Sequence, residues 1–265
     1  MSSTTCLNCN SKLTGPFCAQ CGQSRDTHRI TFKHFIFHDV LHGVFHVERG
    51  MLFTAKQALR RPGIAALDYI AGKRKPYYNV FLLVLFTLGL ILFLRHTYAQ
   101  LEGAQYKKDF VEVNLNEASQ NIDNLLSQKS KIIIFLFVPL AAINSRLLFK
   151  GKRDNLLEHA ILAGMILLGI LLITAIFTTV LYFNFFLKSD DFGELVGEGA
   201  LFTILCYITF GYYNAFRPGL SFLGTATRII GMFVFFAIEF MASLLLVIGY
   251  YTHWEFGDVQ IMPFD

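Results

Sequence analysis

Four of the five cysteines lie close together near the N-terminus. They form two Cys-x-x-Cys pairs, Cys6 with Cys9 and Cys18 with Cys21, with eight residues between the pairs. Zinc prefers four soft ligands in a tetrahedral arrangement, and two such pairs on tight turns supply four thiolates. The spacing therefore predicts a Zn²⁺ site that is structural, because four thiolates leave zinc no open position. Two disulfides are the alternative, and they would require an oxidising compartment.

Four histidines follow at every fourth residue: His34, His38, His42 and His46. In a helix this spacing places the four side chains on one face. Such a stripe could form a second metal site or carry protons. It could equally lie in the membrane interface, where imidazole rings sit beside apolar residues. Both interpretations remain open from the sequence.

Three further ionisable residues lie in or beside apolar segments. Glu239 falls in the middle of the last such segment, where a carboxyl group marks a transport pathway, a proton relay or an internal pair. Glu158 and His159 stand at the start of another segment, and a solvated helix start is the alternative reading for them. Phosphate loops, nucleophile elbows and kinase signatures are absent from the sequence, so we predict no catalytic residue.

The composition indicates which elements must position these residues. The chain has 265 residues, of which 54% are hydrophobic and 16% charged, with a mean hydropathy of +0.48. A soluble domain carries about 25% charged residues, so the chain is expected to be an all-α integral membrane bundle. Its apolar segments predict five transmembrane helices, at residues 77–94, 132–148, 156–187, 200–216 and 229–251.

The chain divides into four parts. Residues 1–27 form the zinc ribbon, and 28–76 form a His-rich, basic juxtamembrane region with amphipathic interfacial helices. Residues 77–252 form the membrane domain, and 253–265 form an external tail. Basic residues just before the first span are expected to bind anionic lipid headgroups, at about 1 kcal/mol each, rather than nucleic acid. These residues are Arg60, Arg61, Lys73, Arg74 and Lys75.

The distribution of charged residues in the loops predicts the orientation. The loops at 146–153 and 217–228 are basic, whereas the predicted turn at 190–198 is acidic and the tail has no Lys or Arg. Basic loops stay in the cytoplasm. The N-terminus is therefore expected in the cytoplasm and the C-terminus outside.

Several motifs together resemble a known family. They are Cys6-x-x-Cys9, Cys18-x-x-Cys21-Gly22-Gln23, Ile30-Thr31-Phe32-Lys33-His34, Arg61-Pro62-Gly63 and Tyr69-Ile70-Ala71-Gly72-Lys73-Arg74. The chain resembles a bacterial zinc-ribbon polytopic membrane protein family of unknown function, catalogued as domain of unknown function 3667. The resemblance covers residues 6–95, and it implies a bacterial inner membrane location but no activity. The five-span layout is also similar in topology to the Yip-like proteins.

Three functions follow from these features. The first is a non-enzymatic scaffold whose zinc ribbon recruits a cytoplasmic protein partner. The second is a transporter or lipid-handling protein that uses Glu239. The third is a metal-dependent membrane enzyme built on the histidine stripe. The sequence does not show a complete set of catalytic residues for such an enzyme. The bundle could also form a homo-oligomer.

Overall fold

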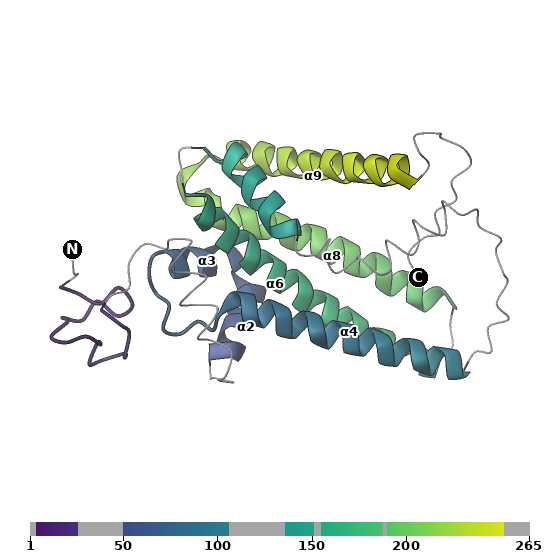
Figure 1. The fold of residues 1–265 in the computed structure, drawn as a ribbon, viewed down its shortest axis with the longest axis horizontal. Helices are drawn as coiled ribbons and strands as arrows, with labels where there is room; N and C mark the ends of the chain where they lie inside the picture. The colour runs from purple at the N-terminus through teal and green to yellow at the C-terminus, as the bar shows by residue number, and fades with distance from the viewer. Residues whose placement is uncertain (1–3, 26–49, 106–135, 151–154, 188–189, 252–265) are drawn as a thin grey trace.

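The computed structural model describes residues 4–25, 50–105, 136–150, 155–187 and 190–251, which are drawn in colour in Figure 1. These residues form helices and an N-terminal knuckle, residues 4–25, and no strand occurs among them. The prediction of an all-α fold is confirmed for this part of the chain. The histidine stripe at 34–46 and the tail at 253–265 lie outside the described residues.

In the described part of the chain, four helices are long and apolar enough to cross a membrane. Four predicted spans thus correspond to α4 (Val80–Gln105), α6 (Leu156–Leu181), α8 (Asp190–Phe216) and α9 (Phe222–Tyr251). The remaining predicted span, 132–148, is described only over the apolar helix Leu136–Leu148. That helix is shorter than the roughly 20 residues that a crossing needs, so five spans are not confirmed.

Helix α6 is the central element of the bundle. It contacts α2, α3, α4 and α8. Of its most apolar stretch of residues, 61% is buried inside the protein, whereas the corresponding share for α9 is 11%. Helix α4 runs parallel to it. A Cβ atom on Gly164 would lie 4.0 Å from Val80, and the Tyr182 hydroxyl donates a 2.6 Å hydrogen bond to the Leu94 carbonyl. Helix α8 runs antiparallel to α6, as Figure 1 shows.

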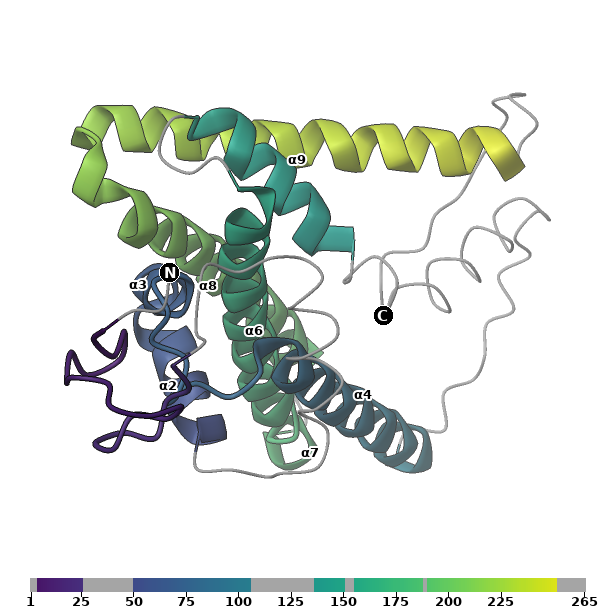
Figure 2. The same ribbon diagram turned by 60° about the vertical axis from the view of Figure 1, so that its left-hand side comes forward.

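Two short helices pack across the end of the bundle at which α4 and α6 begin (Figures 1 and 2). They are α2 (Gly50–Arg60) and α3 (Pro62–Ile70). A Cβ atom on Gly63 would lie 2.5 Å from the backbone nitrogen of Ala215, so α3 touches α8 backbone to backbone. The N–H of Ile64 donates a 2.8 Å hydrogen bond to the Asn214 side chain. Both helices are thereby fixed to the bundle.

The helix boundaries differ from the predicted spans at three places. Helix α6 ends at Leu181, inside the predicted span 156–187, and the separate short helix α7 (Asn184–Leu187) follows. Helix α8 starts at Asp190, ten residues earlier than predicted, so the acidic residues 190–198 are helical. Carboxylates near a helix N-terminus are stabilised by the helix dipole, which favours the longer helix. Helix α9 likewise begins before residue 229, after the 3-10 turn η2 (Arg217–Gly219).

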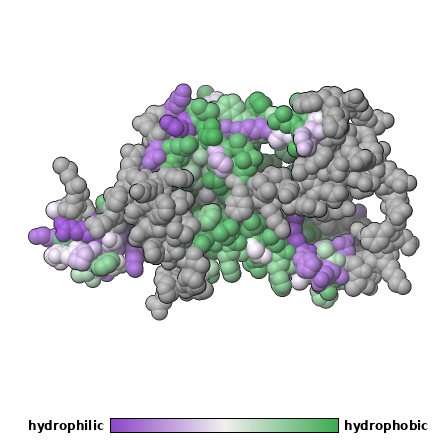
Figure 3. Space-filling view, in the orientation of Figure 1, coloured by the Kyte–Doolittle hydropathy of each residue, from purple (hydrophilic) through white to green (hydrophobic). Residues whose placement is uncertain are grey.

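Apolar side chains cover the middle of the bundle. In Figure 3 hydrophobic residues lie across the helices, whereas the end that carries the N-terminal knuckle is hydrophilic. Large apolar side chains such as Phe86, Phe240 and Ile230 are exposed on the helices. Apolar exposure on this scale indicates contact with lipid. The chain is therefore a multi-pass membrane protein.

Candidate metal centre

The four N-terminal cysteines converge on one point. Ligand atoms of Cys6, Cys9, Cys18 and Cys21 all lie within 4.8 Å of one another. The Sγ–Sγ distance is 3.6 Å for Cys6–Cys21 and for Cys9–Cys18. A tetrahedral set of thiolates about 2.3 Å from a zinc ion would have its sulfurs about 3.8 Å apart. All four are free thiols, not disulfides. The four residues can hold a metal ion.

The knuckle is built from two equivalent turns, one for each Cys-x-x-Cys pair. The backbone N–H of Asn10 bonds the carbonyl of Cys6 at 2.9 Å, and that of Gly22 bonds the carbonyl of Cys18 at 2.8 Å. Asn10 and Gly22 have positive φ angles of 60° and 71°, which Asn and Gly tolerate best. One isolated antiparallel bridge closes each unit. The turn residues thus explain why both pairs point their thiols inward.

Ser11 is a member of the site that sequence reasoning missed. Its hydroxyl lies 2.7 Å from the sulfur of Cys9 and 3.2 Å from that of Cys18. The hydrogen bond from Ser11 is the main cause that lowers the pKa of Cys18, to about 6. Burial raises the pKa of Cys6 to about 11. The buried Cys6 therefore favours its thiol form, and metal binding there would have to release its proton.

The knuckle is docked on the loop between α3 and α4. The side-chain amide of Gln23, which is 4% exposed, donates a 2.8 Å hydrogen bond to the carbonyl of Gly72. The backbone N–H of Lys75 donates a 3.3 Å hydrogen bond to the side-chain oxygen of Gln23. Gly72 has a φ of +99°, and a Cβ atom there would lie 2.7 Å from the side chain of Leu7. These contacts join the candidate metal site to the membrane domain.

The predicted lipid-binding cations surround this docking loop. Asp68 accepts a 2.8 Å hydrogen bond from Lys73 and lies 3.9 Å from Arg61. The guanidinium of Arg74 stacks over the ring of Tyr69 at 5.6 Å. The other two basic residues of the cluster, Arg60 and Lys75, are exposed. Asp68 therefore offsets part of the positive charge of this cluster of five basic residues.

Glu158 and His159 are buried at the start of α6, at 5% and 0% exposure. The solvated helix start that the sequence allowed is therefore wrong for these two side chains. A ring nitrogen of His159, Nδ1, lies 2.7 Å from the hydroxyl of Ser145, and its ring stacks on Phe216. Asn155 caps the helix by accepting from the N–H of Leu157. These contacts describe a packed polar junction between helices.

Glu239 has a hydrogen-bond partner on another helix. The side-chain amide of Asn144 donates a 3.0 Å bond to its carboxyl group, and Asn144 is 2% exposed. Phe137 stacks on Phe236 in the same contact between helix Leu136–Leu148 and α9. The arrangement agrees with the internal pair that the sequence allowed. A role in transport stays a prediction.

Site residues missed by the sequence reasoning share one property. Ser11, Gln23 and Ser145 are common polar residues, and only Gln23, which follows the last Cys-x-x-Cys pair, stood in a motif.

Comparison of the chain with protein-family models, curated proteins and solved structures finds no match.

Proposed function

We propose that the chain is a scaffold protein of the bacterial inner membrane, with a structural Zn²⁺ in its N-terminal knuckle. The knuckle lies in the cytoplasm and recruits a protein partner, while the helical bundle anchors it. The observation that carries this proposal is the convergence of four free thiols in a knuckle that is docked on the membrane domain. Four thiolates would saturate zinc, so the ion would hold the fold rather than activate a substrate.

The knuckle offers an apolar contact to a partner. The side chain of Phe17 is 64% exposed, between the two cysteine pairs. Leu7 on the first turn, in contrast, packs on the docking loop. Exposed aromatic side chains are enriched among residues that anchor protein–protein contacts. Phe17 is therefore the residue through which we expect the partner to bind.

The parallel direction of α4 and α6 supports the five-span topology. If both helices cross the membrane in the same direction, the chain must return to the first side between residues 106 and 155. The apolar helix Leu136–Leu148 lies in that interval. With the basic loops inside, the N-terminus would be cytoplasmic and the C-terminus external. Anionic headgroups of the cytoplasmic leaflet would then face the basic cluster around the docking loop.

A second candidate function is transport or lipid handling through Glu239. The observation in its favour is the Asn144–Glu239 pair, because a polar pair between apolar helices is costly and commonly functional. The third candidate, a metal-dependent enzyme using His34, His38, His42 and His46, falls on residues outside the described ranges. We propose the non-enzymatic role because four thiolates would leave zinc no open position for a substrate.

Metal analysis of the purified full chain tests the proposal first. The wild type should contain about one equivalent of zinc per chain. Cys9→Ser with Cys21→Ser should remove the zinc and leave membrane insertion intact, and Cys206→Ser is the matched control that should keep it. Iron or manganese in place of zinc would contradict the structural role.

Photo-crosslinking in cells tests partner recruitment. A photoreactive residue in place of Phe17 should capture one cytoplasmic protein, and the double cysteine variant should abolish the product. The control position is Phe186, which is 85% exposed and lies on α7, beyond the C-terminal end of α6, whereas the knuckle is docked beside the start of α4. A product of equal yield from both positions, or none from Phe17, would overturn the scaffold proposal.

A further inference from the structure

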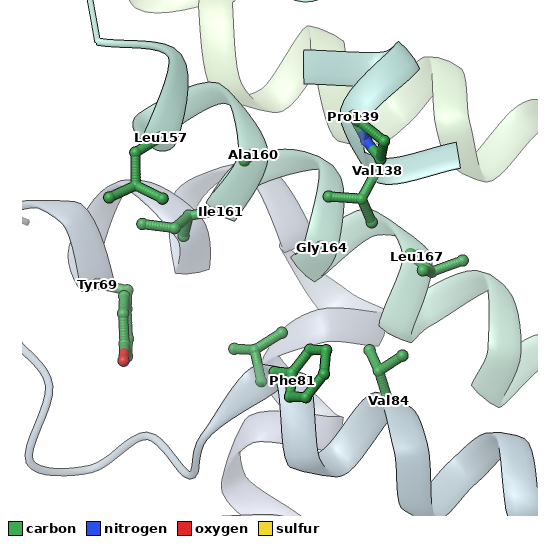
Figure 4. A pocket seen from close by; sticks show the side chains of 11 residues that line it. Tyr69, Phe81, Val84, Val138, Pro139, Leu157, Ala160, Ile161, Gly164 and Leu167 are labelled. Atoms are coloured by element: carbon green, nitrogen blue, oxygen red, sulfur yellow. The ribbon is translucent and has the colours of Figure 1, made fainter. Parts of the chain in front are cut away.

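An apolar cavity of about 260 Å³ lies between α3, α4, α6 and the helix Leu136–Leu148. Figure 4 shows side chains from all four helices turned toward it, including Phe81, Val138 and Ile161. Of its eleven lining residues, only Tyr69 carries a polar side-chain atom.

The position of the cavity places it in one leaflet of the membrane. It is lined by the first turns of α4 and α6, from Val80 to Val84 and from Leu157 to Leu167. These turns adjoin the end of the bundle that carries the knuckle. Helices that begin at the membrane surface have their first turns within the nearer half of the bilayer. The lining from Leu157 to Leu167 extends about 15 Å along α6, so the cavity would span the depth of the acyl chains of that leaflet.

An apolar cavity in this setting is expected to be filled by hydrocarbon. Apolar cavities exclude water and accept apolar guests, because water finds no hydrogen-bond partners in them. An empty cavity forfeits the dispersion contacts of its lining. In a bilayer the apolar molecule present at high concentration is the acyl chain. The volume is below the range of about 300–1,000 Å³ of most ligand pockets, so it would hold part of one chain.

Positive charge lies next to the cavity. Arg74 stacks over the ring of Tyr69, which lines the cavity on the side of the docking loop. Lys73 and Lys75 flank Arg74 in the sequence, and both are exposed. Asp68 pairs with Lys73. A lipid whose chain enters the cavity would thus place its headgroup beside a loop that carries three consecutive basic residues.

We propose that this cavity is a lipid site, in which one acyl chain of an anionic glycerophospholipid enters between α4 and α6 and its phosphate faces the loop around Arg74. The proposal does not depend on the identity of the metal or on the partner of the knuckle. It adds a bound lipid as a structural component of the contact between the membrane domain and the docking loop.

The test is lipid retention by the full chain. The protein is reconstituted in vesicles of equal parts phosphatidylglycerol and phosphatidylcholine, extracted in mild detergent, and analysed by native mass spectrometry. The wild type should retain about one phosphatidylglycerol per chain. Gly164→Leu should reduce retention at least tenfold. Gly164 lines the cavity, and a Cβ atom there has Val80 at 4.0 Å as its nearest contact, so the new side chain fills the cavity.

Two controls separate filling of the cavity from damage to the fold. Gly89→Leu makes the same change on α4 where a Cβ atom meets nothing within 4 Å, and it should retain lipid as the wild type does. Ala160→Leu fills the same cavity from another position and should lose the lipid too, with thermal unfolding reporting that each variant is folded. Equal retention by Gly164→Leu and Gly89→Leu in folded protein would overturn the proposal, as would a wild type that retains none.

A charge variant tests the headgroup contact. Arg74→Gln should lower the ratio of retained phosphatidylglycerol to phosphatidylcholine about fivefold, because one basic residue is lost at the surface. Lys12→Gln removes one charge from the exposed part of the knuckle and should leave the ratio unchanged. If both variants give the wild-type ratio, the site does not select anionic lipid and the proposal is wrong as stated.

Discussion

The side-chain amide of Gln23 bonds Gly72, 49 positions later in the chain, with a donor–acceptor distance of 2.8 Å. This buried bond connects the second cysteine turn to the loop that leads into α4. A structural change in the knuckle is therefore expected to alter the loop that leads into α4, and a change in that loop is expected to alter the knuckle.

Gln23→Ala should undock the knuckle from the loop without removing its metal. The variant removes the hydrogen bond from Gln23 to the carbonyl of Gly72, which keeps a 2.9 Å bond from the N–H of Arg74, so the loss costs about 0.5–1.5 kcal/mol. Hydrogen exchange followed by mass spectrometry should show faster exchange of the amides in residues 71–76, with unchanged zinc content. Gln20→Ala, at an exposed position of the same turn, should exchange as the wild type does. Unchanged exchange in Gln23→Ala would show that the bond does not hold the knuckle.

Gly63→Ala should destabilise the packing of α3 on α8. A Cβ atom there would lie 2.5 Å from the nitrogen of Ala215 and 2.5 Å from the carbonyl oxygen of Gly211, and neither backbone atom can turn away. Such overpacking costs about 1–3 kcal/mol. The matched variant Gly89→Ala has open space and should stabilise α4 by about 0.5–1 kcal/mol. Thermal unfolding in detergent measures both, and a Gly63→Ala midpoint at or above that of the wild type would contradict the close contact.

Glu239→Gln should leave the stability of the bundle nearly unchanged, within about 0.5 kcal/mol. Glutamine keeps an oxygen that can accept the hydrogen bond from Asn144, whereas it cannot titrate. Asn144→Ala should instead cost about 1–3 kcal/mol, because the carboxyl group loses its donor. Thermal unfolding measures both variants, and a destabilised Glu239→Gln beside a near-wild-type Asn144→Ala would show that this hydrogen bond does not stabilise the helix contact. Loss of function in a stable Glu239→Gln protein would favour proton-coupled transport.

Reporter fusions test the orientation. Alkaline phosphatase, which is active only outside the cytoplasm, should be active when fused after Asp265 and inactive when fused after Lys150. The basic loop at 146–153 is expected to remain inside, since positively charged loops are not translocated. A phosphatase that is inactive after Asp265 would mean an even number of crossings. In that case the helix Leu136–Leu148 does not belong to a complete span.

The sequence by itself determined the features that depend on short stretches of chain. Two Cys-x-x-Cys pairs with Asn10 and Gly22 at the turns specify the convergence of four thiols, because turn geometry is decided by a few neighbouring residues. Long apolar runs determined the four helices that can cross a membrane, since length and hydropathy suffice for that prediction.

The tertiary structure decided the contacts between residues far apart in the chain. Nothing local to Gln23 specifies Gly72 as its partner, and the burial of His159 beside Ser145 depends on how α6 meets its neighbours. The parallel direction of α4 and α6, and the cavity between them, follow from the packing of whole helices. Polar partners and cavities depend on three-dimensional packing, because apolar helices of similar composition can pack in several arrangements and only side-chain fit selects one.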